Sequence, residues 1–139
     1  MPQTYGASFA KGHIKRGDYE EAVKAATDDI AGGNDGPEPY FDRGTALDFL
    51  ERFNEAVGDF EKAIEKNSVE ETMDAFALDD AYFSALLAAA KKEPLADAKK
   101  RMARYREVLP TGEHKDDSFQ WEKRLANELP SLLDKTKDF

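Results

Sequence analysis

A short pattern occurs twice in this chain, 34 residues apart. DYEEAV begins at Asp18 and RFNEAV begins at Arg52, so an aromatic residue, an acid and an Ala-Val pair return in the same frame. Repetition at a fixed period of this length is typical of solenoids, in which each unit packs against its neighbours. This period constrains the fold more than any other feature of the sequence.

The second copy belongs to a predicted pair of amphipathic helices over residues 37–68. Tyr40, Gly44 and Leu47 recur at intervals of four and three, which predicts the first helix. The second helix is predicted by an apolar stripe made of Phe53, Ala56, Val57, Phe60, Ala63 and Ile64. We expect Gly44 and Ala56 to lie where the two helices cross, because small side chains allow close backbone approach. One such pair cannot bury both of its faces, so it needs neighbours.

These residues resemble a tetratricopeptide repeat (TPR), a family with a period of 34 residues. Tyr40 matches its first aromatic position, and Gly44 and Leu47 match the glycine and the bulky residue after it. Ala56, Phe60 and Ala63 match its second helix, while Ser68 replaces the usual closing proline. The resemblance implies an all-α, right-handed α-α superhelix of three helical hairpins plus a C-terminal capping helix.

We expect a single domain over residues 1–139. Repeat one covers about residues 3–36, repeat two covers 37–68, a divergent repeat three covers 69–110, and the capping helix and tail cover 115–139. Matching repeat three to the family requires an expansion of eight residues over a strict 34-residue frame.

Polar residues predict several helix ends. Asp18 and Asp35 are expected to cap the second and third helices, and the run from Ser68 to Glu71 has the pattern of a capping box. The fifth helix is therefore expected to run from Val69 to about Lys92. Asp117, with Gln120, is expected to cap a final helix that ends near residue 129, where Pro130 interrupts it.

Composition excludes several functions. The chain has 29 acidic and 20 basic residues, a formal net charge of -9, which argues against sequence-independent nucleic-acid binding. It has no cysteine, which excludes disulfides and thiolate metal sites and favours a reducing compartment. Its N-terminal stretch lacks an apolar run long enough for a signal peptide or a membrane span. We therefore expect a cytoplasmic protein that does not bind membranes.

Catalytic and cofactor motifs are also missing from the sequence. The glycine cluster at residues 32–36 lacks the spacing of a phosphate-binding loop. His13 and His114 lie in no recognisable catalytic pattern, and we interpret both as solvated side chains. Adjacent acids on a helix point about 100° apart, so Asp28-Asp29 and Asp79-Asp80 are interpreted as structural, and Asp116-Asp117 is interpreted as helix capping. The sequence therefore predicts a protein without enzymatic activity, bound metal or cofactor.

The TPR resemblance implies that a concave groove, lined by the first helix of each repeat, binds a partner peptide or helix. Carried over to this chain, the partner-binding positions are Lys11, Phe41, Thr45, Asp48, Phe49, Asp80, Phe83 and Leu87. We interpret Phe41 as free for binding, since Tyr40 already fills the core stripe. Phe41 and Phe83, near Asp48 and Asp80, would suit an apolar anchor beside a base. The alternative for Phe83 is packing inside its long helix.

One TPR subclass, found in co-chaperones of heat-shock proteins, grips a C-terminal carboxylate with Lys, Asn, Asn, Lys and Arg. Here Lys11 is the only base near the expected first-repeat position, and Thr45 stands where an Asn is expected. The sequence therefore departs from that carboxylate clamp.

A basic patch on the sixth helix is the other candidate surface. It consists of Lys99, Lys100, Arg101, Arg104 and Arg106. We interpret it chiefly as a solvated face, and the alternative is an acidic partner or self-association with the acidic second repeat. The predicted function is a non-catalytic protein-interaction module, monomeric or weakly self-associating. The alternatives are a secretion or assembly chaperone and a self-associating scaffold.

Overall fold

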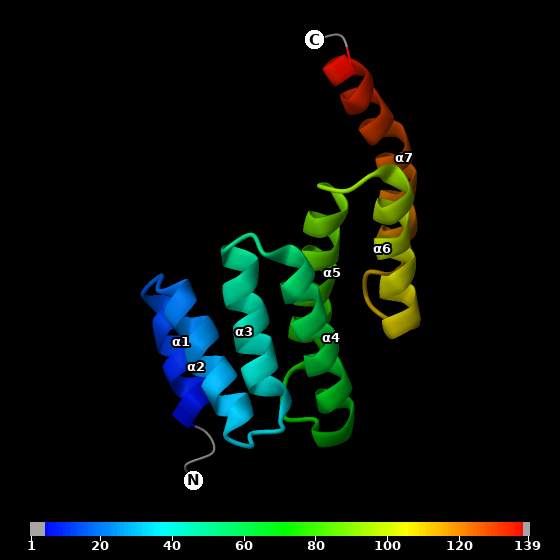
Figure 1. The fold of residues 1–139 in the computed structure, drawn as a ribbon. Helices are drawn as coiled ribbons and strands as arrows, with labels where there is room; N and C mark the ends of the chain where they lie inside the picture. Colours follow the sequence, from blue (N-terminus) through cyan, green and yellow to red (C-terminus); the bar gives the residue numbers. More distant parts are fainter. Residues whose placement is uncertain (1–4, 138–139) are drawn as a thin grey trace. The chain divides into compact units, whose positions relative to one another are not determined.

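The computed structural model describes residues 5–137, which form seven α-helices and contain no strand (Figure 1). The helices are α1 Tyr5–Lys15, α2 Tyr19–Ala31, α3 Pro37–Phe49, α4 Phe53–Glu70, α5 Ala75–Ala90, α6 Leu95–Val108 and α7 Lys115–Lys137. This confirms the expected all-α class. None of the helices within residues 5–137 is both long and apolar enough to cross a bilayer.

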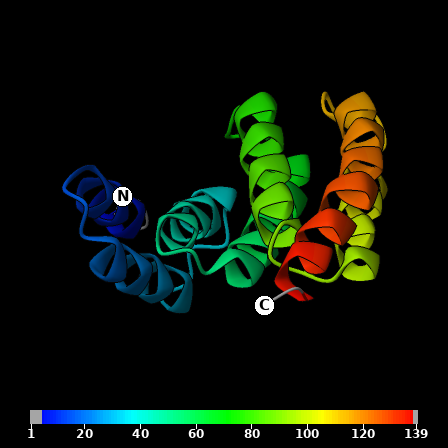
Figure 2. The same cartoon turned by 90° about the horizontal axis from the view of Figure 1, so that it is seen from above.

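The chain divides into two compact units, and the boundary between Tyr82 and Phe83 falls inside α5. In the first unit, α1 packs against α2, α3 packs against α4, and α2 also packs against α3. Figure 2 shows α1 and α3 in one layer of this unit and α2 and α4 in the other. Because α1 and α3 also contact each other, α3 has neighbours on several of its faces.

The repeat period of the sequence is present in the positions of the helices. α2 begins at Tyr19 and α4 begins at Phe53, which is the equivalent position one period later. α6 begins at Leu95, further along the chain than a strict third period would place it. This later start is the one expected for an expanded third repeat.

Close approach of α3 and α4 occurs at Gly44. A Cβ atom at this position would lie 2.9 and 3.0 Å from two ring carbons of Phe60, too close for an unstrained contact. The Phe60 ring therefore occupies the space that the missing side chain leaves, and Ala56 is buried in the same helix. The core of this unit also contains the buried side chains of Ala22, Ala26, Leu47, Val57, Leu78 and Tyr82.

The expected start of the fifth helix is wrong. Ser68 lies inside α4, where its hydroxyl donates to the carbonyl of Glu65 at 2.6 Å instead of capping a new helix. α4 continues to Glu70 because the Asn67 side chain holds the following turn, donating to the Met73 carbonyl and accepting from the Met73 amide. α5 then begins at Ala75 and ends at Ala90.

Two predicted caps also differ from the structure. Gly36, rather than Asp35, holds the N-cap position of α3, and the Asp35 carboxylate instead pairs with Lys66 at 2.5 Å. Pro37 occupies the first turn of α3, as expected for a residue with no amide hydrogen. Asp18 does hold the N-cap position of α2, but its side chain makes no cap hydrogen bond.

In the second unit, α6 packs against α7, and the ring of Phe83, in the second half of α5, contacts rings of α6 and of the loop before α7. Phe83 lies edge-on to Tyr105 at 5.1 Å and stacks on His114 at 4.6 Å between ring centroids. His114 is therefore not the solvated side chain that the sequence suggested. Its backbone amide donates to the Tyr105 hydroxyl at 2.9 Å, which fixes the loop before α7.

The bounds of α7 differ from those predicted. The helix begins at Lys115, so Asp117 lies inside its first turn, where a carboxylate oxygen is 3.0 Å from His114 Nδ1. The backbone stays helical through Pro130 to Lys137, so the predicted interruption is wrong. The last two residues of the expected tail lie outside the described range.

Candidate functional site

The first feature of the predicted binding surface is an ion pair between α1 and α3. Lys11 Nζ lies 2.7 Å from Asp42 Oδ1. Asp42 is only 2% exposed, whereas the Lys11 side chain is 51% exposed. Burial raises the pKa of Asp42, and the hydrogen bond from Lys11 opposes that shift. The charge of Lys11 is thus already engaged by a buried carboxylate.

Asp42 was not identified from the sequence. Its second oxygen, Oδ2, is the one buried side-chain polar atom without a hydrogen-bond partner among the described residues. The sequence signal was the spacing, because Asp42 follows Pro39 by three residues and precedes Ala46 by four. In the structure these three residues form a second buried stripe on α3. This stripe lies on a different side of α3 from Tyr40, Gly44 and Leu47.

Next to this stripe, Phe41, Thr45 and Asp48 follow one another at helical spacing along α3. The Thr45 hydroxyl donates to the carbonyl of Phe41 at 2.9 Å, so it is used within the helix. Asp48 is half-buried and has no ion pair among the side chains described, residues 9–127, and burial raises its pKa. Asp48 is thus an unpaired, partly desolvated carboxylate on the side of α3 that carries Phe41 and Thr45.

Both aromatic side chains predicted on α3 contact other helices of the first unit. Phe41 is half-buried, and its ring lies 5.7 Å from that of Phe60, so it does contribute to packing between α3 and α4. Phe41 is thus not free of the core, contrary to the interpretation from the sequence. Phe49 is 57% exposed and stacks on Tyr19 of α2 at 4.5 Å. One face of this ring is covered, and much of the side chain remains open to a partner.

The other three predicted positions lie on α5. Asp80 is exposed in the first unit, and Leu87 is half-buried in the second. Phe83 is 7% exposed, because its ring is covered by Tyr105 and His114. The structure thus favours the alternative weighed for Phe83, packing inside its own unit.

No protein-family model matches the chain, and no curated protein matches it in sequence. Solved structures do match. The TPR2B domain of yeast Sti1, from a complex with an Hsp70 peptide, has a TM-score of 0.60 at 23% identity, with 92% of this chain and 99% of that chain covered. The first TPR domain of Spaghetti (RPAP3), bound to the HSP90 peptide SRMEEVD, has a TM-score of 0.59 at 20% identity, covering 92% and 93%.

A third similar structure is the second TPR domain of human RPAP3 in complex with the HSP70 peptide SGPTIEEVD. Its TM-score is 0.56 at 19% identity, and the match covers 89% of this chain and 98% of that chain. The chain has the TPR fold. At these identities the likeness establishes the fold and leaves function to the side chains of this chain.

In this TPR fold, the basic patch on α6 is largely neutralised by its own unit. Arg101 makes two hydrogen bonds to Glu93, at 2.9 and 3.0 Å, and Arg104 pairs with Glu107 at 3.1 Å. Arg106 binds Ser118 and Glu122 and lies over the Phe119 ring. Lys99 and Lys100 remain exposed. This pairing weakens the case for an acidic partner on α6.

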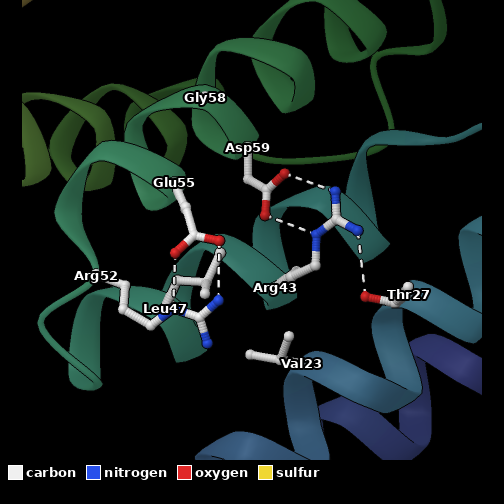
Figure 3. Close-up of a pocket in the computed structure, with 8 residues that line it drawn as sticks. All are labelled: Val23, Thr27, Arg43, Leu47, Arg52, Glu55, Gly58 and Asp59. Carbon is white, nitrogen blue, oxygen red and sulfur yellow. Dashed lines mark hydrogen bonds and ion pairs between the residues drawn. The ribbon is translucent and has the colours of Figure 1, made fainter.

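A pocket of about 470 Å³ lies between α2, α3 and α4 of the TPR fold (Figure 3). The Arg43 guanidinium lies at its centre, donating to both carboxylate oxygens of Asp59 at 2.7 and 2.8 Å and to the Thr27 hydroxyl at 3.2 Å. Arg52 makes two similar bonds to Glu55. These charged groups satisfy one another, so we interpret the pocket as a structural junction between repeats.

Among the described residues, no group of three or more His, Asp or Glu side chains is placed to hold a metal ion.

Proposed function

We propose that the protein is a non-catalytic interaction module in which the face formed by α1 and α3 binds a peptide or helix of a partner protein. The observation that carries this proposal is the state of Asp48 and Phe49 on α3. A half-buried carboxylate without an ion pair among the side chains described, residues 9–127, directly precedes in α3 an aromatic residue that is more than half exposed and stacks on Tyr19 of α2. A partner that covers the ring and supplies a cationic or hydrogen-bonding group to the carboxylate would bury apolar surface and pair the charge together.

The remaining proposed contacts are Phe41, Thr45 and, in the first half of α5, Asp80, whereas Lys11 is held by Asp42. Helix-in-groove and extended-peptide recognition both use an apolar anchor with a few polar contacts beside it, which these residues supply. Phe83 is left out because it is buried. The solved TPR domains that share this fold hold short peptides, which is consistent with the proposal.

A capture experiment tests the proposal. Wild-type protein and an Asp48→Lys/Phe49→Glu variant are immobilised and exposed to lysate, after circular dichroism shows equal helicity. A matched control, Val69→Glu/Glu70→Lys, makes the same kinds of change at exposed positions near the end of α4. We expect a partner to be retained by the wild type and the control and lost by the α3 variant.

Two results would contradict the proposal. Equal retention by all three proteins would show that the α1–α3 face is not used. Loss with the control alone would place binding at the end of α4. Light scattering on the same samples, with mass rising with concentration, would instead favour the self-associating scaffold.

A further inference from the structure

The first unit carries a large excess of negative charge. Residues 1–82 contain 19 acidic and 8 basic side chains, whereas residues 83–139 contain 10 acidic and 12 basic ones. Six of the eight bases already form ion pairs within the unit; they are Lys11, Arg16, Arg43, Arg52, Lys62 and Lys66. Glu38 and Asp48 on α3 have no ion pair among the side chains of residues 9–127. The first unit as a whole therefore favours a cationic partner.

Within the α1–α3 face, Asp42 is only half satisfied. Its Oδ1 accepts from Lys11, while its Oδ2 is buried without a donor among the described residues. Asp29 and Glu38 add negative charge near the same carboxylate. A buried carboxylate oxygen without a donor is destabilising, and a single ammonium contact does not remove that deficit.

A guanidinium group would satisfy both oxygens. Arginine presents its N–H donors in a planar fork that matches a carboxylate, whereas lysine acts as a point charge. The same helix shows this arrangement, because Arg43 holds both oxygens of Asp59 at 2.7 and 2.8 Å. Asp42 is a buried carboxylate that lacks such a partner among the side chains of residues 9–127, and Lys11 is exposed enough to turn toward solvent.

We propose that Asp42 receives an arginine side chain of the bound partner segment, whose guanidinium replaces the Lys11 ammonium and bonds both carboxylate oxygens. This inference rests on the proposed peptide-binding function and assigns it a ligand class, a basic segment with an apolar anchor. This proposed preference is for a basic segment, whereas two of the similar structures hold the acidic peptides SRMEEVD and SGPTIEEVD.

NMR titration with short synthetic peptides tests the inference without a known partner. The probes are acetyl-Ala-Leu-Ala-Xaa-Ala-Leu-Ala-amide peptides in which Xaa is arginine, lysine or the uncharged isostere citrulline. We expect amide shifts centred on α1 and α3 with the arginine peptide, weaker shifts with lysine and none with citrulline. Shifts elsewhere, or equal affinity for all three peptides, would overturn the inference.

Variants of the two paired residues sharpen the test. Lys11→Met removes the competing ammonium and should tighten arginine-peptide binding about tenfold, since charge-assisted bidentate pairs are the strong ones. Lys15→Met removes the same charge one turn away, where no ion pair exists within the described residues, and should change affinity less than about twofold. Equal effects of the two variants would show general electrostatic attraction and reject the exchange at Asp42.

Asp42→Asn should abolish the arginine preference, with Asp28→Asn as the charge-matched control on α2. Should Asp42→Asn fail to fold, the comparison of Lys11→Met with Lys15→Met still decides the question. Failure here is distinct from failure of the proposed function: a partner captured through Asp48 and Phe49, with no arginine preference at Asp42, would reject only this inference.

Discussion

Gly17 and Glu51, one repeat period apart, occupy the same left-handed turn position. Their φ angles are 79° and 59°. In each turn the following amide bonds back to the helix before it, from Asp18 to the His13 carbonyl at 2.8 Å and from Arg52 to the Leu47 carbonyl at 2.9 Å. This is the hydrogen-bond pattern of a Schellman motif, in which glycine is the preferred residue. The repeat is thus preserved in the backbone where the side chains differ.

Glu51→Gly should therefore stabilise the protein. Left-handed backbone costs a residue with a side chain about 1 kcal/mol more than glycine, and part of this is offset by glycine's greater freedom in the unfolded chain. We expect the free energy of unfolding in urea to rise by about 0.5–1 kcal/mol. Glu51→Ala is the control for loss of charge and should give no gain, so an equal gain in both variants would contradict the conformational explanation.

Gly44→Ala should destabilise the first unit, because the new methyl group would meet the Phe60 ring. Overpacking of this kind costs about 1–3 kcal/mol, and a thermal melt should show a lower midpoint. Gly58→Ala is the matched control, since a Cβ atom there meets nothing within 4 Å and the residue lies in the exposed part of α4. That control should gain up to about 1 kcal/mol from helix propensity. A neutral Gly44→Ala would show that Phe60 moves aside freely.

Arg43→Lys tests the junction between repeats. The substitution keeps the charge but removes the two-pronged contact to Asp59 and the bond to Thr27. Both partners of the ion pair are largely buried, so we expect a loss of about 2 kcal/mol in denaturant unfolding. Arg52→Lys alters a similar but more exposed pair and should have a much smaller effect. A double-mutant cycle with Asp59→Asn isolates the interaction energy between Arg43 and Asp59. Absence of coupling would contradict the assignment of this pair as a stabilising junction between repeats.

The sequence predicted the helical repeat because the period is marked by short patterns of neighbouring residues that occur more than once. DYEEAV and RFNEAV mark the starts of α2 and α4, and Gly44 marks the close approach of α3 and α4. Helix ends that depend on a specific side-chain hydrogen bond could not be predicted in this way. The turn before α5 depends on the Asn67 side chain bonding Met73, which competes with the capping-box pattern at Ser68.

The candidate site was predicted only in part, for a similar reason. Lys11 was assigned to a partner because the sequence gives no distance between it and Asp42 on another helix. Phe83 was assigned to the groove although the loop between α6 and α7 brings His114 against its ring. Contacts between residues far apart in sequence decide whether a charged or aromatic side chain remains available, and periodicity within one helix carries no information about them.

Asp48 gives a prediction that links stability to the proposed binding surface. Burial raises the pKa of Asp48 in the folded protein above its ordinary value of 3.8. The folded state therefore favours the protonated carboxyl, and this contribution to stability is present below pH 3.8 and is lost as pH rises through the folded pKa. Asp48→Asn should raise the unfolding midpoint relative to wild type at pH 7, and the difference should shrink toward zero as the pH falls below 3.8.

The control for this measurement is Asp28→Asn, which removes an exposed carboxylate from α2. A gain from both variants would be general relief of the acidic excess in the first unit, whereas a gain from Asp48→Asn alone reflects local burial. An unpaired, half-buried carboxylate lowers stability at neutral pH, and the proposed cationic partner would offset that cost by pairing with it. The same Asp48→Asn variant should therefore be more stable and bind that partner more weakly, and unchanged affinity would separate this stability effect from function.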